Sequence, residues 1–407
     1  MISPAFAVPS VKDDNLVIQK YVSGICCGPT TMAFMGENDI FVLEKISGEV
    51  HIIRNGAFQG TPVLKENVTN DDDQGMLGID VMGNKVYLYF TASSQQGGPP
   101  LCNCVYSYDW DGQKLVNKTL VKTMPHFENY HIGGIMTTDL NGSIYLVVGD
   151  NGRAEEDKAG VLENNATGAP DDTGVILRLT PSNSYYAIGI RNSFGLTVDP
   201  VTGTLWDTEN GPDYGDEINI VPPNFNSGWG IVSGQANATQ LAEIPNYKNY
   251  VYHDPQFTWQ KPVAPTAISF VDSDKFPSYK NSVLVGDCNN GNLYKFELNQ
   301  NRDGFVFQSP QLQHNIVNVG DSMDEIIFGT GFGCMTDIKM GPDGLVYIVS
   351  YSDGAIYRLV PKQYLNSEQS YDNYQYLVYL IPIAGSVVFV VYLKRSKKKP
   401  SMPNKTE

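Results

Sequence analysis

Apolar and polar residues alternate along most of the chain in short runs separated by turns that contain glycine, asparagine or aspartate. A typical run is residues 36–56 (GENDIFVLEKISGEVHIIRNG), where a turn leads into a strand, a second turn and a second strand. A period of two with β-branched and aromatic residues indicates half-buried strands joined as hairpins. The pattern occurs six times, at residues 36–56, 82–112, 140–179, 201–221, 281–298 and 341–360.

These repeated hairpins predict an all-β fold, a six-bladed β-propeller over residues 20–361. A radial arrangement of hairpins leaves only short, protected sheet edges, which suits units spaced irregularly along a chain. Two stacked β-sandwich domains are the alternative, and they require a linker of different composition near the middle of the chain. The sequence has no such linker.

One segment breaks the alternation, because residues 376–393 (YLVYLIPIAGSVVFVVYL) form an unbroken apolar run. As a helix rising about 1.5 Å per residue, it spans a hydrocarbon core of roughly 30 Å. The basic residues of 394–407 follow directly, and basic flanks favour the cytoplasmic side of a membrane. We therefore predict a single-pass membrane protein with a polar stalk at 362–375, a transmembrane helix at 376–393, a cytoplasmic tail at 394–407 and the propeller outside.

Composition and the N-terminal segment 1–19 agree with an exported β-protein. Ala5-Phe6-Ala7 before Val8-Pro9 resembles the end of a signal peptide, although no apolar core precedes it. The chain has 39 Gly, 24 Tyr and 24 Pro against 18% charged residues, a profile that favours short strands over long surface helices. Its net charge of −16 argues against nucleic-acid binding and suits bound Ca²⁺.

Polar and glycine-containing motifs are concentrated in the central third of the chain. They are HIGG at 131–134, VGDNG at 148–152, IRN at 190–192, ENGP at 209–212 and GDE at 215–217. The loops leaving the inner strands of a propeller gather on one face around its axis, so we expect these motifs to converge there.

The segment 185–230 (YYAIGIRNSFGLTVDPVTGTLWDTENGPDYGDEINIVPPNFNSGWG), taken with these motifs, resembles the glucose/sorbosone dehydrogenase family. Weaker similarity covers residues 20–360. Members of that family are aldose dehydrogenases that use pyrroloquinoline quinone (PQQ) on a six-bladed propeller. The resemblance implies a small-molecule sugar substrate, PQQ and Ca²⁺ as cofactors, and hydride transfer from sugar C1 to the quinone.

The resemblance assigns the central chemistry to two residues. His131 matches the general base that takes the proton of the anomeric hydroxyl, a role that suits an imidazole. Arg191 matches a cation beside the reactive quinone carbonyl, where it stabilises developing negative charge. The neighbouring Asn192 is a cofactor-binding candidate. The alternatives are a core histidine, a structural cation and a loop residue.

Calcium is implied at the loop that follows residue 210. Gly211 and Pro212 match positions whose backbone carbonyls hold Ca²⁺, and a hard cation takes oxygen ligands. Asp150, Asp216 and Glu217 are further candidate ion ligands. The alternatives are an ordinary Gly-Pro turn and charges at strand ends.

The chain departs from the family where cations should hold the PQQ carboxylates. The position of the family's lysine is Asn289, and its arginine pair falls at Cys334 and Thr336. Charge-assisted hydrogen bonds of about 1.5–3 kcal/mol each are absent at such positions. A glutamine that the family places before its first glycine turn is matched approximately by Gln74 or Asp73. Binding of PQQ is therefore an open question.

Cysteines stand where this clamp belongs, and the resemblance places Cys26, Cys27, Cys288 and Cys334 on one face. Exported cysteines usually pair, and we expect Cys288 or Cys334 to bond to Cys26 or Cys27. Thiolate ligation of a soft metal such as copper is the alternative. The cysteines at 102–104 face the same side of one strand, so we expect each to pair with a cysteine elsewhere.

Three functions follow from these observations. The leading one is a membrane-anchored, extracytoplasmic sugar dehydrogenase that passes electrons to an acceptor in the membrane or on its periplasmic side. The second is a non-catalytic propeller that binds carbohydrate or protein, which the missing clamp favours. A calcium-dependent hydrolase is the third, and it requires carboxylates clustered at the axis.

Overall fold

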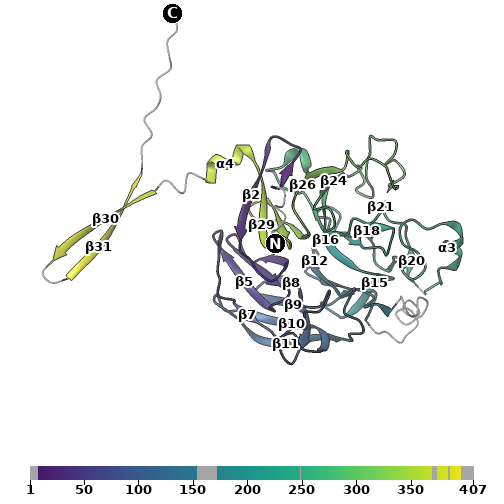
Figure 1. Ribbon diagram of the computed structural model, residues 1–407, viewed down its shortest axis with the longest axis horizontal. Helices are drawn as coiled ribbons and strands as arrows, with labels where there is room; N and C mark the ends of the chain where they lie inside the picture. The colour runs from purple at the N-terminus through teal and green to yellow at the C-terminus, as the bar shows by residue number, and fades with distance from the viewer. Residues whose placement is uncertain (1–7, 154–171, 248, 369–373, 384–385, 396–407) are drawn as a thin grey trace, which may run out of the picture.

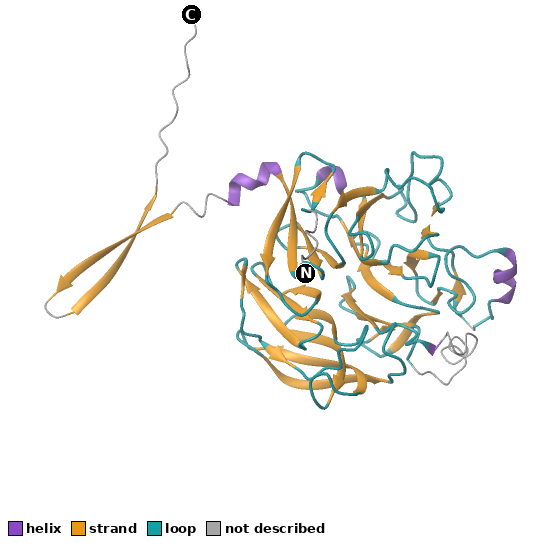
Figure 2. Cartoon of the chain, in the orientation of Figure 1, coloured by secondary structure: helices purple, strands orange, loops and turns teal. Residues whose placement is uncertain are grey.

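The computed structural model describes residues 8–153, 172–247, 249–368, 374–383 and 386–395. Strands make up nearly all of its regular structure, as Figure 2 shows, and the all-β prediction is confirmed. The helices with complete bounds are α3 (Ala238–Glu243), the 3-10 helix η1 (Pro277–Tyr279) and α4 (Lys362–Glu368).

The described strands of the main body form six sheets in the order of the chain. The first sheet contains β3 (Pro29–Phe34), β4 (Asp39–Glu44), β5 (Glu49–Arg54), β6 (Ala57–Phe58) and β7 (Leu64–Lys65). The second contains β8 (Met76–Met82), β9 (Lys85–Ser93), β10 (Pro100–Trp110) and β11 (Leu115–Met124). The third contains β12 (Gly133–Thr138), β13 (Ile144–Val148), β14 (Val175–Arg178), β15 (Ser184–Ile188), β19 (Phe225–Asn226) and β20 (Val251–Tyr252).

The other three sheets carry the same plan to the end of the ring. The fourth contains β16 (Ser193–Val198), β17 (Leu205–Glu209), β18 (Asp216–Val221), β21 (Phe257–Trp259) and β25 (Ile316–Val317). The fifth contains β22 (Pro265–Phe270), β23 (Ser282–Asp287), β24 (Leu293–Glu297), β26 (Ile327–Thr330) and β1 (Ser10–Val11). The sixth contains β27 (Met335–Met340), β28 (Val346–Ser350), β29 (Ala355–Pro361) and β2 (Leu16–Ser23).

The sheets close into a ring, which makes the fold propeller-like (Figure 1). The first strands of the sheets, β3, β8, β12, β16, β22 and β27, contact one another in sequence, and β27 contacts β3 again. Strand β2 pairs with β29 and so completes the last sheet with the start of the chain. Every hairpin expected from the sequence is present, as the second and third strands of its sheet.

The core lies between neighbouring sheets. Phe41 and Ile52 of the first sheet pack with Leu88 and Phe90 of the second, and all four are buried. Strand β1 and the start of β2 lie within residues 1–19, which the sequence separated from the propeller. Leu16 is buried there, so burial of this apolar position draws the N-terminal segment into the ring.

The segment expected to cross a membrane is not helical. The strands β30 (Tyr374–Ile383) and β31 (Ser386–Arg395) pair antiparallel, so the helix expected at 376–393 is wrong. β-branched and aromatic residues dominate both strands, and Pro382 has no amide hydrogen for a helix. In the part of the chain that the structure describes, no helix is both long and apolar enough to cross a bilayer. Helix α4 occupies the first half of the predicted stalk.

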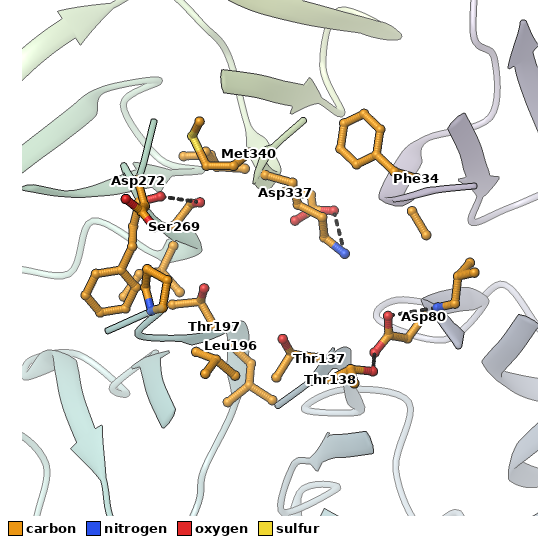
Figure 3. A pocket seen from close by; sticks show the side chains of 18 residues that line it. Phe34, Asp80, Thr137, Thr138, Leu196, Thr197, Ser269, Asp272, Asp337 and Met340 are labelled. Carbon is orange, nitrogen blue, oxygen red and sulfur yellow. Dashed lines mark hydrogen bonds and ion pairs between the residues drawn. The ribbon is translucent and has the colours of Figure 1, made fainter. Parts of the chain in front are cut away.

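Two cavities lie at opposite ends of the six innermost strands. The first residues of these strands, such as Thr30 and Thr336, line a cavity of about 250 Å³. The last residues, such as Phe34 and Met340, line one of about 410 Å³, shown in Figure 3. We call the end at which the innermost strands begin the site face, because HIGG and IRN directly precede or open β12 and β16 there.

Candidate active site

His131 is held rigidly at the site face, just before β12. Its Nδ1 lies 2.8 Å from Asp150 Oδ1, and its backbone N–H donates to Asp73 Oδ2 at 2.8 Å. Its backbone has φ 55°, and a Cβ at Gly149 would lie 2.1 Å from the His131 carbonyl oxygen. Only glycine at 149 therefore lets this loop approach, and Nε2 is left as the ring nitrogen for proton transfer.

Asp150 acts as an orienting carboxylate, which the sequence did not distinguish from an ion ligand. Its side chain is fully buried. Besides His131, Oδ1 accepts from the N–H of Gly152 at 2.9 Å, and Oδ2 accepts from Trp229 Nε1 at 2.5 Å. Both oxygens are thus engaged by protein donors, and the carboxylate fixes the ring of His131.

Arg191 belongs to the same network. Its guanidinium lies over the Trp229 ring at 5.0 Å from the centroid, and its Nη1 donates to the carbonyl oxygen of Asn210 at 3.0 Å. Its Nε is buried without a partner among the described residues, as is Oδ1 of Asn192. Such unpaired buried groups suit a site that receives polar ligand atoms.

The expected calcium loop is shaped by Asp216. Its Oδ1 accepts from the N–H of Gly211 at 2.8 Å, and its Oδ2 accepts from the N–H groups of Val263 and Ala264 at 2.6 and 2.7 Å. Both oxygens therefore hold backbone N–H groups in place. Burial raises the pKa of this carboxyl. Pro212 is exposed on the same loop.

Gly211 belongs to this loop, and Glu217 follows Asp216 on β18. A Cβ at Gly211 would lie 2.1 Å from the carbonyl oxygen of Tyr214, so the turn requires glycine. Glu217 Oε1 accepts from Gly234 N at 2.5 Å and Oε2 from Asn219 Nδ2 at 3.0 Å. Burial raises the pKa of Glu217 well above its usual value, so a nearby cation would stabilise the ionised carboxylate.

The family's carboxylate clamp has no charged counterpart at the matching positions. Asn289 donates to the carbonyl oxygen of Pro262 at 3.4 Å, and Thr336 donates to that of Pro29 at 3.0 Å. Cys334 is bonded to another cysteine. These three positions present no charge to a ligand.

The axial cavity on the site face adds one cation that the sequence did not reveal. Lys45 lines it together with Asp72 and Asp73, and burial lowers the pKa of Lys45 while burial raises that of Asp73. Gln74 is buried beside them. His131 adjoins the cavity through Asp73 and is not one of its lining residues, and neither is Arg191. One cation against two carboxylates does not fit a tricarboxylate, so the clamp side of the site does not fit PQQ.

The cysteines pair locally. The structure contains Cys26–Cys27, Cys102–Cys104 and Cys288–Cys334, and its described residues hold no free cysteine. The expected bridge between first and last blades is wrong because positions 288 and 334 adjoin each other across the fifth and sixth sheets. The expectation for 102–104 is wrong because their Cα atoms are 5.5 Å apart, within disulfide range. Thiolate ligation of copper therefore has no thiolate in this state.

Two buried residues near His131 and Arg191 were not singled out from the sequence. Trp229 lies in the segment 185–230 as part of NSGWG. The signal available in the sequence was its indole N–H, a donor that needs an acceptor when it is buried. Glu209 accepts from Arg191 N at 2.6 Å and from Ser227 Oγ at 2.7 Å, and burial raises the pKa of Glu209 to about 7.

Comparisons with known proteins identify the family of the chain. The chain matches the Glucose / Sorbosone dehydrogenase family over residues 27–358. It is 26% identical over 260 residues to an aldose sugar dehydrogenase of Escherichia coli, covering 60% of this chain and 64% of that protein. It is 23% identical over 369 residues to an uncharacterized protein of Synechocystis, covering 81% and 83%.

Solved structures show the same fold at low identity. A putative glucose dehydrogenase of Thermus thermophilus superposes with a TM-score of 0.65 at 22% identity, over 85% of this chain and 100% of that one. A PQQ-bound aldose sugar dehydrogenase of Streptomyces coelicolor superposes with a TM-score of 0.63 at 19% identity, over 87% and 99%. Because the family match covers most of the ring, the chain belongs to the glucose/sorbosone dehydrogenase family.

Proposed function

We propose that the protein is a sugar dehydrogenase that oxidises the anomeric carbon of an aldose at the site face. The observation that carries the proposal is the pairing of His131 Nδ1 with the fully buried Asp150 at 2.8 Å. A base that is oriented by a buried carboxylate suits removal of a hydroxyl proton. The resemblance to aldose sugar dehydrogenases supplies the substrate class.

The residues of the chain have separate tasks in this reaction. His131 accepts the proton of the C1 hydroxyl on Nε2, and Asp150 stabilises the imidazolium that forms. Arg191, held by Trp229 and Asn210, supplies positive charge beside the reacting atoms. The loop at Gly211 and Pro212 would offer carbonyl oxygens to Ca²⁺, with Glu217 as a nearby carboxylate.

The hydride acceptor is the weakest point of the resemblance. In this family PQQ supplies that acceptor when it is bound. The proton-transfer side of the site suits such an enzyme, whereas Asn289, Cys334 and Thr336 provide no charge for the cofactor's carboxylates. Binding of PQQ by this chain is therefore the first property to measure.

We further propose that the propeller works outside the cytoplasm, held at a membrane by the apolar segment 376–393. The support is the unbroken apolar composition of this segment and the basic cluster after it, since apolar surface and basic side chains both favour attachment to a membrane surface. A sugar dehydrogenase in this place could deliver electrons to an acceptor in the membrane or on its periplasmic side.

The test is a titration of the full-length protein with PQQ and Ca²⁺, followed by dye reduction with a panel of aldoses. We expect turnover that falls by about 10²–10⁴ in His131→Ala, because the general base is lost. The matched control is His314→Ala, which removes an exposed imidazole that is not among the proposed reacting residues. Absence of both a quinone spectral change and turnover would contradict the enzyme proposal.

That negative result would favour the second candidate, a non-catalytic module that binds carbohydrate or protein with the same loops. The observation that favours it is the uncharged clamp and the acidic axial cavity. Retention of the protein on immobilised glycans, weakened by substitution of Asp73 and unaffected by PQQ, is the expected result for such a module.

A further inference from the structure

Three side chains at the outer hairpin of the first sheet converge on one point that the proposed reaction does not use. Glu44 ends β4, and Glu49 and His51 lie on β5. Glu44 pairs with Glu49 and Val42 with His51, so the three side chains share one face of the sheet. The side chains of His51 and Glu44 are 4% and 2% exposed, and that of Glu49 is 20% exposed. The cluster is shielded from water but open at one edge.

The tautomer of His51 is set by a backbone contact. Its Nδ1 lies 3.0 Å from the carbonyl oxygen of Gln59. A carbonyl only accepts, so Nδ1 carries a hydrogen and donates it, and in neutral imidazole Nε2 then bears a lone pair. This Nε2 faces Glu49 Oε2 at 3.2 Å and Glu44 Oε1 at 3.6 Å. Three electron-rich atoms therefore face one another, and a cation is the partner that such a group lacks.

The remaining oxygen of each carboxylate is already engaged. Ser47 Oγ donates to Glu44 Oε2 at 2.8 Å, and Lys65 Nζ donates to Glu49 Oε1 at 2.7 Å. With the Gln59 carbonyl on His51 Nδ1, every member of the cluster is oriented by a second residue. Metal ligands in proteins are oriented in this way, with the other imidazole nitrogen donating to a carbonyl or carboxylate.

We propose that Glu44, Glu49 and His51 bind a divalent transition metal of the Zn²⁺ class. Ligands at about 2.0–2.2 Å on a tetrahedron lie about 3.3–3.6 Å apart. The separations of Nε2 from the two oxygens, 3.2 and 3.6 Å, are close to that edge length. An imidazole with two carboxylates suits Zn²⁺ better than Ca²⁺, which takes oxygen ligands.

The charge balance and the position of the cluster give this metal a structural role. Two carboxylates with Lys65 and a neutral His51 carry a net charge of −1, which a divalent cation reverses. Glu44 and Glu49 flank the turn 45–48, and Lys45 of this turn lines the axial cavity. The metal would join both arms of the hairpin and fix the turn that carries Lys45.

The experiment is a Zn²⁺ titration of the chelator-treated full-length protein in excess Ca²⁺, which saturates sites built from oxygen alone. We expect a single tight equivalent in the wild type and in His314→Ala, and its loss in His51→Ala. Ser47→Ala, which frees one oxygen of Glu44, should bind about tenfold more weakly. Co²⁺ in place of Zn²⁺ should give the intense visible bands of a tetrahedral site.

Equal Zn²⁺ stoichiometry and affinity in the wild type and His51→Ala would overturn the proposal. So would a wild type that binds no Zn²⁺ and whose His51 ring carries hydrogens on both nitrogens by ¹⁵N NMR, because an imidazolium would then bridge the carboxylates. Should His51→Ala fail to fold, Glu49→Gln at the open edge decides: weaker Zn²⁺ binding supports the site, and unchanged affinity contradicts it.

Discussion

At the scale of single residues, one carboxylate connects the two side chains that the resemblance assigns to the chemistry. Asp150 accepts from His131 with one oxygen and from Trp229 with the other, and the Trp229 ring lies under the guanidinium of Arg191. A change at Asp150 therefore reaches both the base and the cation. This residue touches no substrate in our proposal, so it is a positioning residue.

Asp150→Asn should lower kcat for aldose oxidation by about 10²–10⁴ while KM changes little. The asparagine keeps the shape of the side chain but removes the charge that stabilises the imidazolium. The measurement is kcat and KM over a range of pH, since the altered base should also displace the acidic limb of the profile. If kcat stayed unchanged and kcat/KM fell only because KM rose, Asp150 would shape the substrate-binding site instead.

A second residue-scale prediction concerns the buried pair of Asp199 and Arg302. Burial acts to raise the pKa of Asp199, but hydrogen bonds from Arg302, Val201 N and Thr202 outweigh it and hold this pKa below the ordinary 3.8. The folded pKa is depressed, so the stabilisation is present above about pH 4 and is lost as pH falls through the folded value. Arg302→Ala should lower the free energy of unfolding by about 3 kcal/mol at pH 7, because it leaves a buried charge unpaired.

Urea denaturation at pH 7 and at pH 3 checks this expectation, and the difference between wild type and variant should shrink at the lower pH. Lys280→Ala, which removes an exposed ion pair with Asp274, is the control and should change nothing measurable. A difference that is equal at both pH values would show that Arg302 contributes by packing alone.

At the scale of elements, neighbouring sheets are joined by side-chain packing, and the fifth and sixth sheets are also joined by a disulfide. Cys288 follows β23 and Cys334 precedes β27, so their disulfide links the fifth sheet to the sixth beside the axial cavity. The bond closes a loop of 46 residues, which restricts the unfolded chain.

Replacing both Cys288 and Cys334 by serine should lower the free energy of unfolding by about 2–4 kcal/mol. Denaturation of the oxidised wild type and the double variant measures the loss. The matched comparison is the serine pair at positions 102 and 104, which closes a loop of only two residues and should cost less. Equal losses in both would contradict the role of the longer loop.

At the scale of the whole molecule, the ring is complete before the C-terminal apolar segment begins. The last strand of the ring, β29, ends at Pro361, and residues 376–393 lie beyond it. A chain that ends after residue 368 should therefore keep the melting temperature of the full-length protein within the error of calorimetry. It should also leave the membrane fraction, and a truncated chain that still sediments with membranes would contradict attachment through 376–393.

Much of this architecture is readable from local patterns, and the exceptions have physical causes. Alternation over 36–56 and its counterparts predicts the hairpins because strand pairing there is local. The pairing of Leu16 with Pro361 is not predictable in this way, since it joins the two ends of the ring. The apolar run 376–393 satisfies the length rule for a span and also the residue preferences of strands, and the structure follows the latter.

Some residues of the candidate site are likewise predictable from local sequence, and others are not. His131, Arg191 and Gly211 are marked by their motifs, because each lies in a loop of special geometry. Lys45, which lines the axial cavity, carries no local signal of its role, and Trp229, which holds Asp150, shows only a single indole N–H within NSGWG. Their roles come from neighbours that are distant in the sequence, such as Asp150 for Trp229, 79 residues away, and that only the folded ring brings together.

The joint between β2 and β29 sets the order of events during biosynthesis. Strand β2 is made before all six innermost strands of the ring, yet its partner β29 is among the last strands of the ring to be made. At about 5–20 residues per second of synthesis, β2 stays without its partner strand for a time on the order of tens of seconds. Until then a nascent chain carries an unpaired edge, so chaperones and proteases meet an open ring, and a stalled or prematurely terminated chain never closes it.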